Sequence, residues 1–164
     1  MDFQMITFSP IAAATAAGLS AGQLANWQDR YDAIPHRRAG RGVPAFYLFN
    51  DILQIAAIAA LVDHGLTPKA AIDALRPYTV TAALMGSGVF RLVRNKEGRW
   101  YGGDNPEAEV SIDIRMWPIF DRVFPAVVNS LRAQPGKMSA AEVEASIAEF
   151  TAFMNERRQA QKQA

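Results

Sequence analysis

The fold is decided by residues 9–31, which read SPIAAATAAGLSAGQLANWQDRY. Ser9 followed by Pro10 indicates a helix start, because a serine hydroxyl can cap a free backbone amide and proline at the first helical position loses no hydrogen bond. The alanine-rich segment 11–17 favours helix, and Gly18 can adopt the left-handed conformation that ends one. The first helix is therefore predicted to be short.

A second helix is predicted to begin at Ser20, after a turn of only a few residues. Ser20 and Gln23 have the spacing of a capping box, in which each residue satisfies a backbone amide of the other. Apolar residues follow at helical spacing and should face inward: Leu24, Trp27 and Tyr31. The opposite face then carries small or hydrogen-bonding side chains: Gly22, Gln23, Asn26 and Arg30.

The polar face of this second helix has the chemistry needed to read DNA. A major groove is about 12 Å wide and admits a helix, and there Asn and Gln can pair bidentately with adenine and Arg with guanine. Many amphipathic helices turn such a face simply to water. On this helix alone, both interpretations remain open.

The segment after the second helix is basic. Between Arg30 and Gly42 the single acid is Asp32, and the cationic or titratable residues are Arg30, His36, Arg37, Arg38 and Arg41. The aromatic run at residues 46–49 then has the character of a strand. This pattern predicts a wing, a two-stranded hairpin whose tip presents arginines to phosphate groups. A solvated surface loop is the alternative interpretation.

Two further helices are predicted before Pro77. Asn50 opens a strongly periodic segment that ends near Gly65, with its apolar face marked by Ile52, Ile55, Ile58, Leu61 and Val62. The pair Thr67 and Pro68 starts another helix over residues 69–76, with Ile72 and Leu75 facing inward.

In this order the elements resemble the DNA-binding domain of the MerR family, a winged helix-turn-helix followed by a helix pair. Three segments carry the resemblance: residues 11–27 (IAAATAAGLSAGQLANW) resemble the first two helices, residues 45–49 (AFYLF) the wing strand, and residues 51–75 (DILQIAAIAALVDHGLTPKAAIDAL) the helix pair. The resemblance covers residues 6–76. It implies that the helix beginning at Ser20 reads the major groove and that the wing arginines lie beside the DNA backbone.

The candidate DNA-binding residues therefore lie on the second helix, in the basic segment and at the start of the strand after it. They are Ser20, Gly22, Gln23, Asn26, Arg30, His36, Arg37, Arg38, Arg41 and Tyr47.

The second half of the chain predicts a three-stranded antiparallel sheet and two helices. Residues 89–94 and 99–101 flank a turn, and residues 109–116 alternate between polar and apolar side chains, which is typical of a half-buried strand. The next helix opens at Trp117, is expected to cover the sheet, and should kink or break at Pro125. The last helix runs from Ser139 through about Arg157 and either packs on its own unit or pairs with its copy in a second subunit.

The predicted fold class is mainly α with a small β component: a winged helix-turn-helix followed by a small α+β unit. We expect a DNA-binding domain over residues 1–77, a dimerisation or regulatory domain over residues 78–157, and a polar tail over residues 158–164 that frays.

Composition disfavours several classes of protein. Lys and Arg number 17 and Asp and Glu 16, a net charge of +1, which disfavours a strongly basic nucleoid-coating protein. The chain has no cysteine, hence no disulfide framework, thiolate metal site or redox switch. His36 and His64 have no carboxylates at metal-ligating spacing, so no catalytic residue, cofactor or metal is predicted and we do not expect an enzyme. Without a signal peptide or an apolar run near 20 residues, we expect a cytoplasmic protein with no membrane partner.

Two functions of different class fit these features, and double-stranded DNA is a partner in both. The first is a sequence-specific transcriptional regulator that acts as a homodimer, since one winged helix reads only a few base pairs. Its C-terminal unit would dimerise or receive a small effector or a protein signal. The second is an antitoxin-like or phage-type interaction protein, whose C-terminal half binds a protein partner while the winged helix autoregulates. Residues 89–154 have the composition of a segment that folds alone, which favours the regulator.

Overall fold

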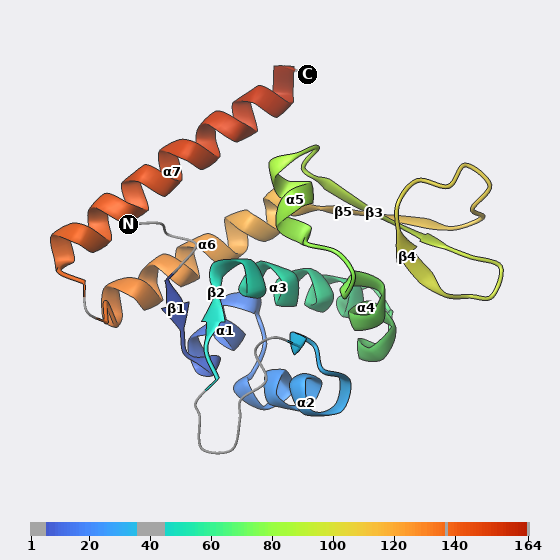
Figure 1. The fold of residues 1–164 in the computed structure, drawn as a ribbon, viewed down its shortest axis with the longest axis horizontal. Helices are drawn as coiled ribbons and strands as arrows, with labels where there is room; N and C mark the ends of the chain where they lie inside the picture. The colour runs from blue at the N-terminus through green and yellow to red at the C-terminus, as the bar shows by residue number, and fades with distance from the viewer. Residues whose placement is uncertain (1–5, 36–44, 137, 164) are drawn as a thin grey trace.

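The computed structural model describes residues 6–35, 45–136 and 138–163. Within these ranges the chain is mainly helical, with one two-stranded and one three-stranded antiparallel sheet, which confirms the predicted fold class (Figure 1). The N-terminal part consists of β1 (Thr7–Phe8), α1 (Pro10–Ala17), α2 (Ala21–Tyr31), β2 (Tyr47–Leu48), α3 (Phe49–Asp63) and α4 (Pro68–Leu75).

The turn between α1 and α2 forms as the sequence predicts. The Ser9 hydroxyl accepts from the amide of Ala12 at 3.3 Å, and Gly18 ends α1 with φ of 81°, a left-handed conformation that glycine adopts without steric cost. The amide of Leu19 then donates to the carbonyl of Ala14 at 2.9 Å, which closes the helix end. Local hydrogen bonds therefore set the angle at which the chain enters α2.

Helix α3 lies at the centre of the molecule and packs against α1, α4, α5 and α6. The predicted apolar face is buried except at Val62, which is partly buried, and burial extends well around the helix to Leu53, Ala56, Ala57 and Ala59. Alanines at these positions let the neighbouring helices approach closely. The sequence pattern suggested one buried stripe because it could not show that α6 covers a second side.

Strand β2 pairs with β1 at the start of the chain, in the antiparallel register Thr7↔Leu48 and Phe8↔Tyr47. Ala33 and Ile34, before the basic segment, are buried bends, so the described residues just before that segment contribute no strand to the predicted wing hairpin, which stays a prediction. The basic segment itself, residues 36–44, lies outside the described residues.

The C-terminal part begins with α5 (Val80–Met85) and continues into β3 (Val89–Arg94), β4 (Trp100–Gly102) and β5 (Ser111–Arg115). The strand order is β4-β3-β5, which confirms the predicted three-stranded antiparallel sheet. The sheet projects from the helical body (Figure 1). At its outer end Val110 is 43% exposed, so the predicted apolar face begins only at Ile112.

Helix α6 (Met116–Ala133) packs against α1 and α3 rather than covering the sheet as predicted. It follows β5 directly, continues past Pro125 without interruption, and brings its aromatic residues to the N-terminal part. The ring of Phe49 at the start of α3 meets Phe120, Phe124 and Phe150 edge-on, with centroid distances of 6.1, 6.2 and 5.4 Å. One hydrophobic core therefore includes residues from both halves of the chain.

Helix α7 (Ala140–Gln163) begins just after Ser139, as predicted, and with a capping box: the amide of Ser139 donates to Glu142 Oε2 at 2.7 Å, and the Ser139 hydroxyl accepts from the amide of Glu142 at 3.3 Å. Its apolar stripe is buried within its own chain, at Val143, Ile147, Phe150 and Met154.

The last helix does not end near Arg157, and residues 158–163 are not a separate polar tail. Arg158 lies over the ring of Trp117 at 4.2 Å and pairs with Asp121 at 2.5 Å. The side chain of Gln161 accepts from Trp117 Nε1 at 2.6 Å and donates to the carbonyl of Leu84 at 2.7 Å. The polar composition of residues 158–163 indicates fraying, but these contacts with residues distant in sequence keep them in α7.

Candidate nucleic-acid interface

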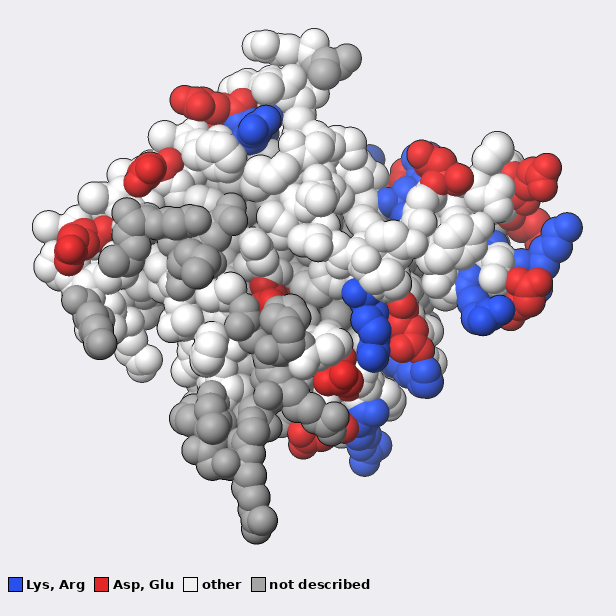
Figure 2. All heavy atoms as spheres, viewed as in Figure 1, with Lys and Arg blue, Asp and Glu red and all other residues white. Residues whose placement is uncertain are grey.

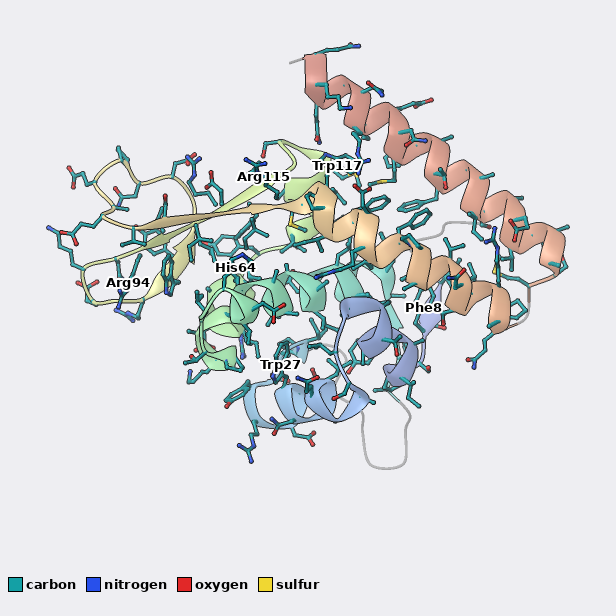
Figure 3. All side chains as sticks on the ribbon, turned by 180° about the vertical axis from the view of Figure 1, so that it is seen from behind. Phe8, Trp27, His64, Arg94, Arg115 and Trp117 are labelled. Atoms are coloured by element: carbon teal, nitrogen blue, oxygen red, sulfur yellow. The ribbon has the colours of Figure 1, made fainter. Side chains whose placement is uncertain are left out.

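Helix α2 has the two faces that the sequence predicts. Leu24 and Trp27 are 1% and 6% exposed and pack inward, and Trp27 points from α2 toward the body of the molecule (Figure 3). The opposite face is exposed and carries Gly22, Gln23, Asn26 and Arg30. The structure thus brings the candidate residues of α2 together on one outer surface.

The capping box changes what each amide on this face can offer. The amide of Ser20 donates to Gln23 Oε1 at 2.9 Å, and the Ser20 hydroxyl accepts from the amide of Gln23 at 3.1 Å. Among the described residues nothing engages the Nε2 donors of Gln23, while its oxygen already accepts from Ser20. Asn26 makes no hydrogen bond to any described residue, so both its donor and its acceptor face outward. Of the two amides, Asn26 is the one equipped for a bidentate contact.

Glycine at position 22 is not required by the protein's own packing. A Cβ placed there would meet only the Ser20 hydroxyl oxygen, at 4.0 Å, and the backbone is in α2. What glycine provides here is a low outer surface, over which another molecule can approach the helix backbone closely.

The C-terminal end of α2 is fixed by a buried side chain that the sequence analysis did not single out. Gln28, 7% exposed, donates to the carbonyl of Ile34 at 2.8 Å and accepts from the amide of Ile34 at 3.0 Å. Asp32 ends the helix in the left-handed conformation with φ of 53°. The chain thereby turns back along α2 just before the basic segment. In the sequence, the only sign that Gln28 fixes the end of α2 is its position next to the inward-facing Trp27.

The match to known families falls on this part of the molecule. Residues 8–77 match the profile described as MerR HTH family regulatory protein. This segment is therefore a MerR-like helix-turn-helix domain. No curated protein matches the chain at a significant level.

Charge on the described surface of the MerR-type domain is mixed. Acidic and basic side chains lie side by side over α2 and α4 (Figure 2). Asp29 flanks Arg30 in sequence, and Arg76 and Lys69 are paired with Asp73. Any strongly positive field must therefore come from His36, Arg37, Arg38 and Arg41, all of which lie outside the described residues.

Tyr47 does not lie on this outer surface, which corrects its place among the candidates. It is 2% exposed in β2, because pairing with β1 turns its ring into the core. Burial, together with the nearby carboxylates of Asp51 and Asp29, raises the pKa of the Tyr47 hydroxyl above its usual value. Tyr47 is therefore a core residue that stabilises the domain, not a DNA-contacting one.

Among the described residues, no helix is long and apolar enough to cross a membrane.

Proposed function

We propose that this protein is a sequence-specific transcriptional regulator whose α2 enters the major groove while the basic segment contacts the DNA backbone. The observation that carries the proposal is the exposed face of α2, with Asn26 and Arg30 outward, on a MerR-family helix-turn-helix domain. Such domains serve DNA-binding transcription regulators, which are generally not enzymes, and we do not propose a catalytic activity.

Within this proposal, different residues of α2 contact bases and phosphates, according to the hydrogen bonds that each can make. Asn26 can pair with adenine through its free amide, and Arg30 can pair with guanine. The Ser20 hydroxyl and the backbone amides of Ala21 and Gly22 can donate to a phosphate, because these amides at the helix N-terminus lack partners within the helix and the capping box does not use them. Gln23 can contribute only the donors of its Nε2 group, because its oxygen is engaged. Base discrimination should therefore depend most on Asn26 and Arg30.

The proposed regulator acts as a dimer, because two half-sites about one helical turn apart give the affinity that specific regulation requires. The buried stripe of α7 is occupied by its own chain and is not available to a second copy. A dimer must instead use an outer surface of the C-terminal unit, residues 78–157. We propose that the same unit receives any effector or protein signal.

Salt-dependent DNA binding tests the role of the basic segment. The triple variant Arg37→Ala, Arg38→Ala and Arg41→Ala should bind every duplex more weakly. The slope of log affinity against log salt should fall in magnitude by about 0.9 for each phosphate that the variant no longer neutralises. Fluorescence anisotropy with labelled duplexes at several salt concentrations gives this slope.

A second triple variant controls for the loss of three positive charges. Arg94, Lys96 and Arg99 lie around the β3–β4 turn, and replacing them with alanine removes the same formal charge far from α2. This control should leave the slope unchanged. Equal slopes for the wild type and the variant of residues 37, 38 and 41 would rule out the wing.

A further inference from the structure

The C-terminal end of α2 is tied to α4 by one side chain. The guanidinium of Arg76, which caps α4, donates to the carbonyl of Tyr31, the last residue of α2, across 45 positions of sequence. Its Nη1 lies 4.0 Å from the carboxylate of Asp32, and its Nη2 lies 3.7 Å from that of Asp73. Arg76 thus contacts both the last residue of α2 and the residue that ends it.

This contact differs from an ordinary surface ion pair. Exposed ion pairs contribute little, because solvent screens them and the side chains lose entropy. A carbonyl at a helix C-terminus, however, lacks a partner within the helix and points along the helix axis. A guanidinium placed there satisfies that carbonyl and interacts favourably with the helix dipole. The bond therefore constrains the direction of α2 as well as its position.

Arg76 is itself held against the central helix. Gln54 of α3 donates to the carbonyl of Leu75 at 2.8 Å and accepts from the amide of Val80, at the start of α5, at 3.3 Å. The residue beside Arg76 is thereby fixed to a helix that is buried nearly all round. Arg76 and Gln54 therefore connect the end of α2 to the core of the molecule.

Apart from the two hydrogen bonds that join Gln28 to the neighbouring Ile34, the rest of α2 is held mainly by apolar packing at Leu24 and Trp27. Apolar contacts are non-directional, so they fix the depth of a helix better than its tilt. Base-reading side chains must be placed to within about 0.5 Å to form paired hydrogen bonds. Arg30 lies between this packing and the Arg76 contact, and Asn26 lies on the exposed face opposite the packing, so a change of tilt moves both.

We propose that Arg76 is a positioning residue for the recognition helix, which sets the angle of α2 and so the discrimination between DNA sequences. The inference rests on the proposed function. Arg76 makes no base contact in this role, and its removal should misplace Asn26 and Arg30 while leaving backbone contacts in place.

The test compares two duplexes: one selected by the wild-type protein from a random-sequence library, and one of the same composition in scrambled order. Arg76→Gln should reduce the ratio of the two affinities by about tenfold, comparable to disrupting one bidentate base pairing, with affinity for the scrambled duplex and its salt slope unchanged. Arg76→Lys keeps a donor and a charge and should restore part of the ratio. Thermal melting by circular dichroism verifies that each variant is folded.

Arg132→Gln is the matched control, because Arg132 is another exposed arginine in an ion pair, with Glu144 at 2.7 Å, and it lies in the last turn of α6, away from α2 (Figure 1). It should leave the ratio unchanged. If Arg76→Gln weakens both duplexes equally and lowers the salt slope by about 0.9, Arg76 is a phosphate contact and the proposal is overturned. An unchanged ratio in the folded Arg76→Gln protein also overturns it. If the wild type selects no preferred duplex, the proposed function fails first, and the positioning role fails with it.

Discussion

At the scale of single residues, exposure alone does not determine what a side chain on α2 can do. Gln23 and Asn26 carry the same amide and are both exposed, but the capping box engages the oxygen of Gln23. Tyr47 and Gln28 are polar but buried, and they stabilise the domain beneath the exposed face of α2 rather than forming part of that face. The amino-acid type suggested DNA contact for Tyr47, and only its packing excluded it.

Position 22 separates the needs of folding from those of binding. Gly22→Ala should raise the free energy of unfolding by about 0.5 kcal/mol, because glycine disfavours a helix and a Cβ has room here. The same methyl group should weaken DNA binding, since it stands between the helix backbone and the groove. Urea denaturation and anisotropy titration measure the two effects. A variant that is more stable and binds equally well would show that DNA does not approach α2 at this point.

At the scale of elements, each helix start that the sequence predicted from a capping serine or threonine is present. The side chains of Ser9, Ser20, Thr67 and Ser139 all accept a backbone amide three residues on. Helix ends and partners were predicted less well. Helix α7 runs past its expected end because Arg158 and Gln161 dock on α6 and α5, and α6 packs on the helices because its aromatic residues meet Phe49.

The start of α7 should be sensitive to acid. Hydrogen bonds from Ser139 hold the pKa of Glu142 below its ordinary value of 4.5, and the two bonds from Arg132 do the same for Glu144. A carboxylate with a lowered pKa in the folded state stabilises that state above the ordinary pKa, and the contribution is lost as the pH falls through the lowered value.

The double variant Glu142→Gln and Glu144→Gln tests this expectation. It should be less stable than the wild type at pH 7, and the difference should shrink as the pH falls below 4.5. Urea denaturation at a series of pH values measures it. A difference that persists unchanged down to about pH 2.5, where carboxylates are protonated, would show that the two side chains act through packing rather than charge.

At the scale of the whole molecule, the two halves share one core. Phe49 belongs to the MerR-type domain, and its ring is enclosed by Phe120, Phe124 and Phe150 from the other half. The boundary at Pro77 that the sequence suggests stays a prediction. The two halves are joined by apolar packing of α6 against α1 and α3, so we expect them to unfold together.

Phe150→Ala probes this coupling. Phe150 is 7% exposed, and its replacement should cost about 3–5 kcal/mol of unfolding free energy. With Trp100 and Trp117 replaced by phenylalanine, the fluorescence of Trp27 reports on α2 alone, and its urea midpoint should shift together with that of far-ultraviolet circular dichroism. Phe153→Ala, at a position 38% exposed on the same helix, is the control and should cost about 1 kcal/mol or less. A Trp27 transition that ignores Phe150→Ala would show that the two halves unfold independently.

The sequence by itself determined the helix starts, the glycine turn, the two faces of α2, the antiparallel sheet and the family of residues 8–77. These features depend on side-chain to backbone contacts three or four residues apart, or on a periodicity that a single element displays. The tertiary structure alone decided that β2 pairs with β1, that Tyr47 is buried, that α6 and α7 close over Phe49, and that Arg76 holds the end of α2. Those contacts join residues tens of positions apart, and no local pattern can indicate which distant partner will fill the space beside them.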